Sequence, residues 1–397
     1  MKSSDNISNE MRLIEKVFKD NSQLALELKR KIEELSKKIK AKFGEEKKIK
    51  IMNFCGTHEW SIVRYGIRAL MPKNVELIAG PGCPVCVTPS YYIEEAIKLA
   101  LEGYKIYTYG DTYRLMAVKN ISGVKSLSEV KSLGGDVQVV TSILDASKYA
   151  NSDSKESIFL GIGFETVAPG YAIAISSNLI PKKMSIMSLL KLTPPAMLYT
   201  IKGLTEEEKS VFGIIAPGHV SSVIGANSWK FLSNDYNIPT VISGFEPIDI
   251  LVSIMEILKQ IVRKRAETVI EYKRAVNWEG NKFAKNLINE VFYPSDDAWR
   301  GIGILPKSGL RIREKFEDYD SFKKLGIREI DPLNWKDEKL PGCRCSEVII
   351  GKIKPIECPL FMKKCTPENP YGPCMVSMEG TCYIWARFGT IENFEVE

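Results

Sequence analysis

Apolar residues follow two different spacings along this chain, one before residue 48 and another after it. Residues 8–43 carry apolar side chains one helical turn apart, which predicts a helix that Asn21 and Ser22 could break and recap. From Lys48 onward, short apolar runs alternate with amphipathic stretches. This alternation is typical of a parallel, doubly wound α/β sheet.

Two such α/β units follow one another in the predicted order of elements. The expected strands cover residues 48–54, 75–79, 105–109, 137–141, 157–161, 185–189, 211–216 and 240–243. The helical patterns between them cover residues 59–70, 91–101, 127–133, 168–177, 195–202, 220–231 and 248–276. The polar interval 151–156 is expected to be a linker between the units, and residues 278–340 an irregular connection.

The expected fold is α/β, with two similar doubly wound α/β domains and a cysteine-rich domain that is mostly helical or irregular. The predicted boundaries are 1–47 for an N-terminal helical segment packed on the C-terminal domain, 48–150 and 151–277 for the α/β domains, and 278–397 for the cysteine-rich domain. A chain of 397 residues is too long for one ordinary core, which agrees with this division.

Composition narrows the class of protein. A hydrophobic content of 44% and a charged content of 26% are those of a soluble globular protein. The net charge is +6, but the lysines are dispersed and no arginine cluster alternates with aromatic residues, so we expect no nucleic-acid binding. Residues 1–12 contain no apolar leader, and no apolar run reaches the roughly 18 residues that span a bilayer. We therefore expect a cytoplasmic protein without a membrane segment. Disulfides are rare in that compartment, so nine cysteines indicate metal or redox chemistry.

Cys55 lies between a strand-like run and a helical pattern whose expected N-cap is Thr57. The positive end of the helix dipole would favour its thiolate, which is both a soft metal ligand and a nucleophile. The alternative is a small, inert core residue. The chain has two histidines. His58, close to Cys55, is expected to be functional, whereas His219 is expected to hydrogen-bond locally at a turn.

Cys83 and Cys86 form a CPVC motif that glycine and proline flank. This setting is typical of a dithiol/disulfide redox pair or of half a metal site, although the pair could simply pack a turn. Glu59, Glu165 and Glu246 also follow predicted strands. These carboxylates could face one cleft, or they could interact favourably with helix N-termini.

The tail, residues 341–397, combines six cysteines with many glycines and prolines. The cysteines are Cys343, Cys345, Cys358, Cys365, Cys374 and Cys382. Four of them have the spacing C-x14-C-x6-C-x16-C, and these are Cys343, Cys358, Cys365 and Cys382. Four thiolates without histidine fit a [4Fe–4S] cluster or an all-cysteine zinc site. Structural disulfides are the third alternative.

These motifs, in this order, resemble those of the HypD family of hydrogenase maturation factors. The resemblance covers nearly the whole chain after residue 48. It rests on the six-cysteine tail and on CGTHE at 55–59, GPGCPVC at 80–86, GFET at 163–166, PGHVS at 217–221 and GFEP at 244–247. The loop at 110–115 departs from the pattern, because the family more often has MLRVP after its Gly-Asp.

The resemblance implies a metallocofactor assembly scaffold with redox activity. Members of the family act with the small protein HypC to build the Fe(CN)2CO unit of [NiFe]-hydrogenases, and they receive cyanide from HypE. The hydrogenase large subunit would be reached indirectly, through HypC. The implied cofactors are a [4Fe–4S] cluster in the third domain and a transient iron that carries cyanide and carbonyl ligands.

By the same resemblance, Cys55 would bind this iron together with a cysteine of HypC, and His58 would lie beside it as a supporting group or a ligand. Cys83 and Cys86 would be a redox-active pair near the same site. The cluster ligands would be Cys343, Cys358, Cys365 and Cys382, with Cys345 and Cys374 as a thiol pair between cluster and iron. We expect the iron site to lie in a cleft between the two α/β units, which would keep water and free cyanide away.

Two other functions fit part of the pattern. A cluster-dependent thiol-disulfide oxidoreductase of the ferredoxin-thioredoxin reductase kind would explain the CPVC motif and the tail, but not the CGTHE turn. An interaction scaffold with a zinc-stabilised tail would explain the tail alone.

Overall fold

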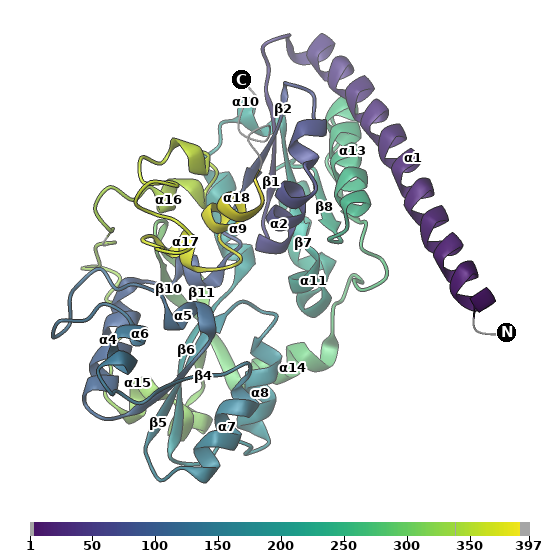
Figure 1. The fold of residues 1–397 in the computed structure, drawn as a ribbon. Helices are drawn as coiled ribbons and strands as arrows, with labels where there is room; N and C mark the ends of the chain where they lie inside the picture. Colours follow the sequence, from purple (N-terminus) through teal and green to yellow (C-terminus); the bar gives the residue numbers. More distant parts are fainter. Residues whose placement is uncertain (1–3, 338, 390–397) are drawn as a thin grey trace.

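The computed structural model describes residues 4–337 and 339–389, with side chains of the first helix from residue 21 onward. The strands form two separate sheets, which Figure 1 shows one above the other. The C-terminal region, drawn in yellow, lies at one side between the levels of the two sheets. The predicted α/β class is confirmed, with two sheets in which most neighbouring strands are parallel.

The first sheet is parallel throughout and has the strand order β2-β1-β7-β8-β9. Its strands are β1 (Ile49–Asn53), β2 (Val75–Ala79), β7 (Phe212–Pro217), β8 (Thr240–Ser243) and β9 (Thr268–Ile270). Strands β7 and β8 are buried along their whole length. Continuous apolar runs of this kind are typical of a parallel sheet that helices cover on both faces.

The second sheet has the order β10-β11-β6-β5-β3-β4. Its parallel strands are β3 (Lys105–Thr108), β4 (Val137–Val139), β5 (Ser157–Gly163) and β6 (Met184–Lys191). An antiparallel hairpin, β10 (Phe292–Trp299) and β11 (Gly303–Ile312), extends it beside β6. The prediction of an irregular connection misses this hairpin, because Pro294 and two aspartates interrupt the apolar pattern of β10.

The predicted boundary between residues 150 and 151 does not separate the two sheets. The chain begins the first sheet with β1 and β2, builds the parallel part of the second with β3 to β6, returns with β7 to β9 and ends with the hairpin. The polar interval 151–156 contains the end of α7 (Ile143–Ser152) and its connection to β5, beside the second sheet. Apolar patterns identify strands, but they carry no information about which strands pair.

The first helix, α1 (Ser4–Phe43), packs against α13 (Pro247–Arg263), and not on the C-terminal domain as predicted. Leu28, Ile32 and Ile39 of α1 are buried in one core cluster with apolar residues of α13. The apolar spacing predicts the helix correctly, but the tertiary fold determines which element the helix packs against.

The structure also differs from the prediction in the extent of two helices. Helix α1 continues through Asn21 and Ser22 without a break. Helix α13 was expected to extend to residue 276, but it ends at Arg263 because Lys264 adopts a left-handed conformation with φ of 53°. Strand β9 follows where the helix was expected to continue.

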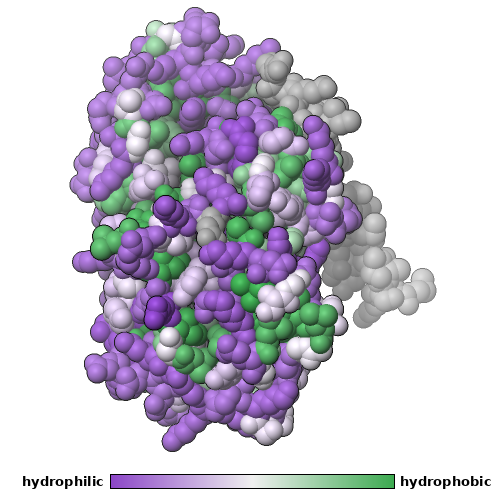
Figure 2. Space-filling model, turned by 90° about the vertical axis from the view of Figure 1, so that its left-hand side faces the viewer, coloured by the Kyte–Doolittle hydropathy of each residue, from purple (hydrophilic) through white to green (hydrophobic). Residues whose placement is uncertain are grey.

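Shorter helices connect the strands, and the last three of them lie within the largely irregular C-terminal region. They are α2 (Gly56–Arg64), α3 (Pro84–Val87), α4 (Ser90–Leu101), α5 (Gly110–Tyr113), α6 (Leu127–Ser132), α8 (Ala168–Ser176), α9 (Thr193–Lys202), α10 (Glu206–Lys209), α11 (Gly218–Ile224), α12 (Lys230–Asn234), α14 (Lys282–Val291), α15 (Ser321–Lys324), α16 (Cys345–Val348), α17 (Pro373–Val376) and α18 (Thr381–Phe388). Among the described residues, no helix combines the length and the apolar character needed to cross a bilayer. Figure 2 shows hydrophilic residues over most of one face, with hydrophobic ones in small scattered groups.

Candidate functional site

A cleft of about 380 Å³ lies where the carboxyl ends of strands from both sheets meet. Cys55 after β1, Asp111 after β3, Phe164 after β5 and His219 after β7 line it, and Glu379 of the C-terminal region completes its wall. Open α/β sheets bind ligands at this end of their strands. The candidate site is therefore at the meeting point of the two sheets and the tail.

Cys55 is the N-cap residue of α2, two residues before the predicted cap at Thr57. Its backbone is extended, with φ of −149° and ψ of 132°. Gly82 packs against it so closely that a Cβ there would lie 2.7 Å from the Cα of Cys55. The carbonyl of Gly82 also accepts a hydrogen bond from Gly56 N at 3.3 Å. The glycine after β2 thus allows the two loops to hold Cys55 at the cleft.

The thiol of Cys55 is neutral in these surroundings. Burial raises its pKa to about 11 and the carboxylate of Glu379 adds to the effect, while hydrogen bonds from the backbone of Thr57 and His58 oppose it. Hydrogen bonds at the helix N-terminus lower the pKa of Cys55 as predicted, but burial raises it by more, so the thiolate is not the favoured form. The residue is partly open to the cleft, although protein atoms crowd the sulfur. A soft cation that binds this sulfur would have to displace its proton.

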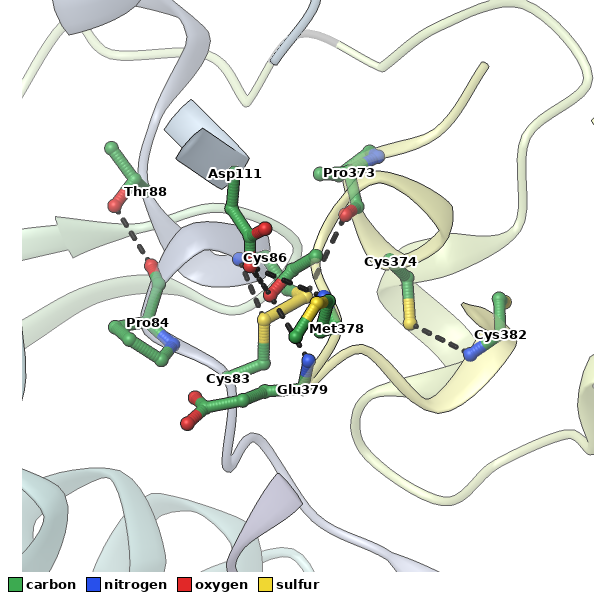
Figure 3. Close-up of a disulfide and its surroundings, with 11 residues drawn as sticks. Cys83, Pro84, Cys86, Thr88, Asp111, Pro373, Cys374, Met378, Glu379 and Cys382 are labelled. Carbon is green, nitrogen blue, oxygen red and sulfur yellow. Dashed lines mark hydrogen bonds between the residues drawn. A yellow bond between two sulfur atoms is a disulfide. The ribbon is translucent and has the colours of Figure 1, made fainter. Parts of the chain in front are cut away.

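The carboxylates of Asp111 and Glu379 line the cleft, although the sequence motifs do not predict either residue as part of the site. Asp111 Oδ2 accepts hydrogen bonds from Ser377 Oγ at 2.9 Å and from Met378 N at 3.1 Å, which ties α5 to the C-terminal segment. Glu379 follows in that segment (Figure 3). It is open to the cleft, yet enclosure by the walls raises its pKa to about 7, and Asp111 adds to this shift. The one signal for Glu379 in the sequence is an acidic residue between the last two cysteines.

Both histidines stack on the ring of Phe245, but only His219 lines the cleft. His58 is buried, and its Nε2–H donates to the carbonyls of Ser243 at 3.2 Å and Gly244 at 2.9 Å. Its Nδ1 has no hydrogen-bond partner in the described part of the chain, and burial lowers its pKa to about 4. His219 lines the cleft and stacks on Phe245 with ring centroids 3.8 Å apart, while His58 stacks on the same ring at 4.6 Å. A role of His58 beside a metal stays a prediction.

Cys83 and Cys86 are joined by a disulfide (Figure 3). Both residues are buried at the start of α3, and the sulfur of Cys83 accepts a hydrogen bond from Cys86 N at 3.2 Å. The sulfur of Cys86 lies 3.8 Å from the carbonyl oxygen of Pro373, at the first turn of α17 in the tail. The CPVC motif thus connects the cleft with the cysteines of the tail. Its redox activity stays a prediction.

The six cysteines of the tail gather among short helices, and five of them are buried. The side chains of Cys343, Cys345, Cys374 and Cys382 contact one another in series. The contact with Cys343 lowers the pKa of Cys345, but the contact with Cys374 and burial together raise it well above its usual value. The two cysteines predicted as a thiol pair, Cys345 and Cys374, are therefore neighbours.

The predicted cluster ligands lie close enough to interact electrostatically, Cys365 with Cys343 and Cys358, and Cys382 with Cys343 and Cys365. Their role as ligands stays a prediction. Among the described residues, no three histidine, cysteine, aspartate or glutamate groups are arranged to hold a metal ion. The donor set nevertheless suits a sulfur-ligated group. A Cβ on Gly372 would lie 2.6 Å from the sulfur of Cys343, so the glycine leaves a cradle there.

Glu59 of the CGTHE turn faces inward and joins the tail to the first sheet. Its buried carboxylate accepts hydrogen bonds from Asn53 Nδ2 at 2.8 Å, from Arg68 Nη2 at 2.8 Å and from Trp385 Nε1 at 2.6 Å. The guanidinium of Arg68 also lies 4.9 Å from the ring centroid of Trp385. Since Trp385 belongs to α18, this network fixes the last helix beside Cys55.

The other strand-end carboxylates have structural roles too. Glu246 is the N-cap of α13. Glu165 accepts hydrogen bonds from Thr193 N at 2.7 Å and from Thr193 Oγ1 at 3.1 Å, at the start of α9. None of the three predicted carboxylates is among the described residues that line the cleft.

Glu165 should make the stability of the fold depend on pH. Burial raises its pKa from 4.5 to about 7, so between these values the folded state binds the proton more tightly than the unfolded state. Its contribution is complete below about pH 4.5 and is lost as the pH rises through about 7. We expect the stability of Glu165→Gln relative to wild type to rise by about 1–3 kcal/mol between pH 5 and pH 8 in urea unfolding. Glu246→Gln is the control, and parallel pH profiles for wild type and Glu165→Gln would refute the expectation.

Comparison with known proteins assigns the family. Residues 30–389 match the HypD family model, described as the hydrogenase formation hypA family. A protein of Methanocaldococcus jannaschii is 42% identical over 365 residues, which cover 91% of this chain and 96% of that protein. The hydrogenase maturation factor HypD of Cupriavidus necator is 40% identical over 365 residues, 89% of this chain and 94% of the relative. The HypD of Escherichia coli is 34% identical over 356 residues, 88% and 92% of the two chains. This chain therefore belongs to the HypD family of hydrogenase maturation factors.

Proposed function

We propose that the chain is a scaffold on which the Fe(CN)2CO unit of [NiFe]-hydrogenases is assembled, and that it holds the iron at Cys55. Membership of the HypD family supports a role in hydrogenase maturation. The observation that carries the finer assignment is the position of one sulfur. Among the described residues that line the cleft, Cys55 is the only cysteine, and it lies where both sheets and the tail meet.

The chemistry of the iron unit suits this position. Low-spin iron(II) with cyanide and carbonyl ligands favours a soft thiolate donor. The cleft of about 380 Å³ is within the size range of small-ligand sites, and its walls would limit the access of water. Because the thiol of Cys55 holds its proton firmly, iron binding would release that proton to the surroundings.

Partners complete the proposed site. A cysteine of HypC would share the iron with Cys55, and HypE would deliver cyanide. The Cys83–Cys86 pair is suited to redox support, because Cys83 shares a small pocket with Cys55. A [4Fe–4S] cluster, when bound by Cys343, Cys358, Cys365 and Cys382, would supply single electrons. Cys345 and Cys374 would then act as a thiol pair between the tail and the cleft.

An infrared spectrum of the anaerobic complex tests the proposal. The chain, produced with HypC and HypE and purified without oxygen, should show absorption bands of cyanide and carbonyl bound to iron. The same preparation without HypE should lack the cyanide bands. A wild-type complex that contains all three proteins but no iron with these bands would contradict the proposal. A disulfide reductase of the ferredoxin-thioredoxin reductase kind would give that result.

A further inference from the structure

The turn between β10 and β11 lies between two cysteine motifs that are far apart in the sequence. Arg300 N donates a hydrogen bond of 2.7 Å to the carbonyl of Val87, the last residue of α3. The next residue, Gly301, has φ of +81°, and a Cβ there would lie 2.6 Å from the Cβ of Ser346 in α16. The turn is therefore held between the CPVC helix and the helix that begins at Cys345.

The side chain of Arg300 is buried without a matching partner. It is 7% exposed, and its Nε and Nη2 atoms lack hydrogen-bond acceptors in the described part of the chain. Among the described residues, no carboxylate forms an ion pair with Arg300. Asp337 and Glu94 interact with its charge electrostatically, and so do Cys343 and Cys345. A buried charge without a paired counterion costs several kcal/mol. Local violations of this kind are typical of functional sites.

Arg300 shares a pocket with three cysteines. Arg300 lines a pocket of about 20 Å³ together with Cys86, Cys343 and Cys345. One cysteine of the CPVC disulfide and two cysteines of the tail thus line the same pocket as this arginine.

We propose that Arg300 is a positioning residue that stabilises the anionic sulfur formed when the Cys83–Cys86 disulfide is reduced. This rests on the proposed function only in taking Cys83 and Cys86 as a redox pair. The sulfurs of a disulfide carry no charge, whereas a reduced Cys86 can carry a negative one. A positive charge beside that sulfur favours the reduced form and makes the disulfide a stronger oxidant.

The redox step is a thiol–disulfide exchange with a dithiol as the reductant. A thiolate of the dithiol bonds to the sulfur of Cys86, the bond between Cys83 and Cys86 breaks, and Cys83 leaves as a thiolate. The second thiolate of the dithiol then displaces Cys86 and closes a new disulfide. Two electrons pass to the Cys83–Cys86 pair, and the two protons of the dithiol pass to these cysteines or to solvent. Cys345 and Cys374 are such a dithiol within the chain.

A redox equilibrium of the full-length chain tests the role of Arg300. Wild type and Arg300→Met are equilibrated in buffers of reduced and oxidised dithiothreitol, the thiols are alkylated, and the fraction of reduced Cys83 and Cys86 is measured by mass spectrometry. We expect the equilibrium constant for reduction to fall about tenfold in the variant, which lowers the midpoint potential by about 30 mV. Arg300→Lys keeps the charge and should restore most of this shift.

Arg344→Met is the matched control. It removes a guanidinium between Cys343 and Cys345 in the sequence, but this one is partly exposed and paired with Glu347 at 2.6 Å. The control should leave the equilibrium constant of the Cys83–Cys86 pair unchanged. An equal shift in both variants would mean that net charge alone sets the potential, and it would overturn the role of Arg300.

The melting temperature of Arg300→Met distinguishes the proposed redox role from a purely structural one. Loss of an unpaired buried charge should leave the melting temperature of Arg300→Met unchanged or raise it. A purely structural arginine would instead lower the melting temperature and leave the redox equilibrium as in wild type. Arg300→Gln, measured in the same way, replaces the methionine variant if that variant does not fold.

Two failures can be told apart. If the wild-type pair cycles and neutral variants of Arg300 match it within twofold, the inference about Arg300 is wrong and the proposed iron assembly is unaffected. If the wild-type pair stays oxidised over the whole dithiothreitol range, the redox pair of the proposed function fails, and the role of Arg300 fails with it.

Discussion

The Cys55→Ala variant, purified anaerobically with HypC and HypE, should show no infrared bands of cyanide or carbonyl bound to iron. The intensity of these bands per complex should fall at least about tenfold, because mutation of even the groups that hydrogen-bond to a metal ligand lowers metal affinity by about that factor. The cleft offers no second cysteine among its described lining residues, so no equivalent soft donor replaces the lost sulfur.

Thr166→Val is a control for this loss, because Thr166 lines the same cleft and carries no sulfur. It should keep both the iron and the infrared bands. A Cys55→Ala complex that still binds iron with cyanide and carbonyl ligands would show that the iron is held elsewhere.

The Glu59→Ala variant should lose about 3–5 kcal/mol of unfolding free energy, the usual cost of removing one partner from a buried ion pair. Without the carboxylate, Asn53, Arg68 and Trp385 lose the acceptor that they share. Urea unfolding measures the loss. Limited proteolysis should also cut the C-terminal region faster, because the network holds α18 against the first sheet.

Glu45→Ala provides the comparison for this loss. The carboxylate of Glu45 is 77% exposed and pairs with Lys40 at 3.4 Å. A pair of this kind contributes about 1 kcal/mol or less. Similar losses in Glu45→Ala and Glu59→Ala would mean that the buried network does not hold the tail in place.

The positions of most strands could be predicted because each is a short apolar run between polar turns. The predicted ranges 75–79 and 240–243 coincide with β2 and β8. The assignment of strands to sheets could not be predicted in the same way. Strand β1 pairs with both β2 and β7, and nothing in its own sequence indicates the second partner. The apolar pattern does not predict the hairpin, because β10 contains a proline and two aspartates.

The candidate site was predictable where glycine and proline mark special backbone positions. The close packing of Gly82 against Cys55 and the disulfide between Cys83 and Cys86 agree with the motifs. Asp111 and Glu379 were not predictable, because they come from the second sheet and the tail and meet Cys55 only in the folded chain. The error in the protonation of Cys55 has the same origin, since its burial and the charge of Glu379 depend on tertiary structure.

The order in which the chain visits the two sheets also constrains how it is made. A nascent chain that has emerged as far as β6 contains β1 and β2 but lacks β7, which pairs with β1 in the finished sheet. One side of β1 must therefore remain without its neighbour during much of translation, and an open strand edge of this kind invites pairing with other chains. The half of the molecule that begins first is completed only after β9, so it cannot fold as an independent unit on the ribosome.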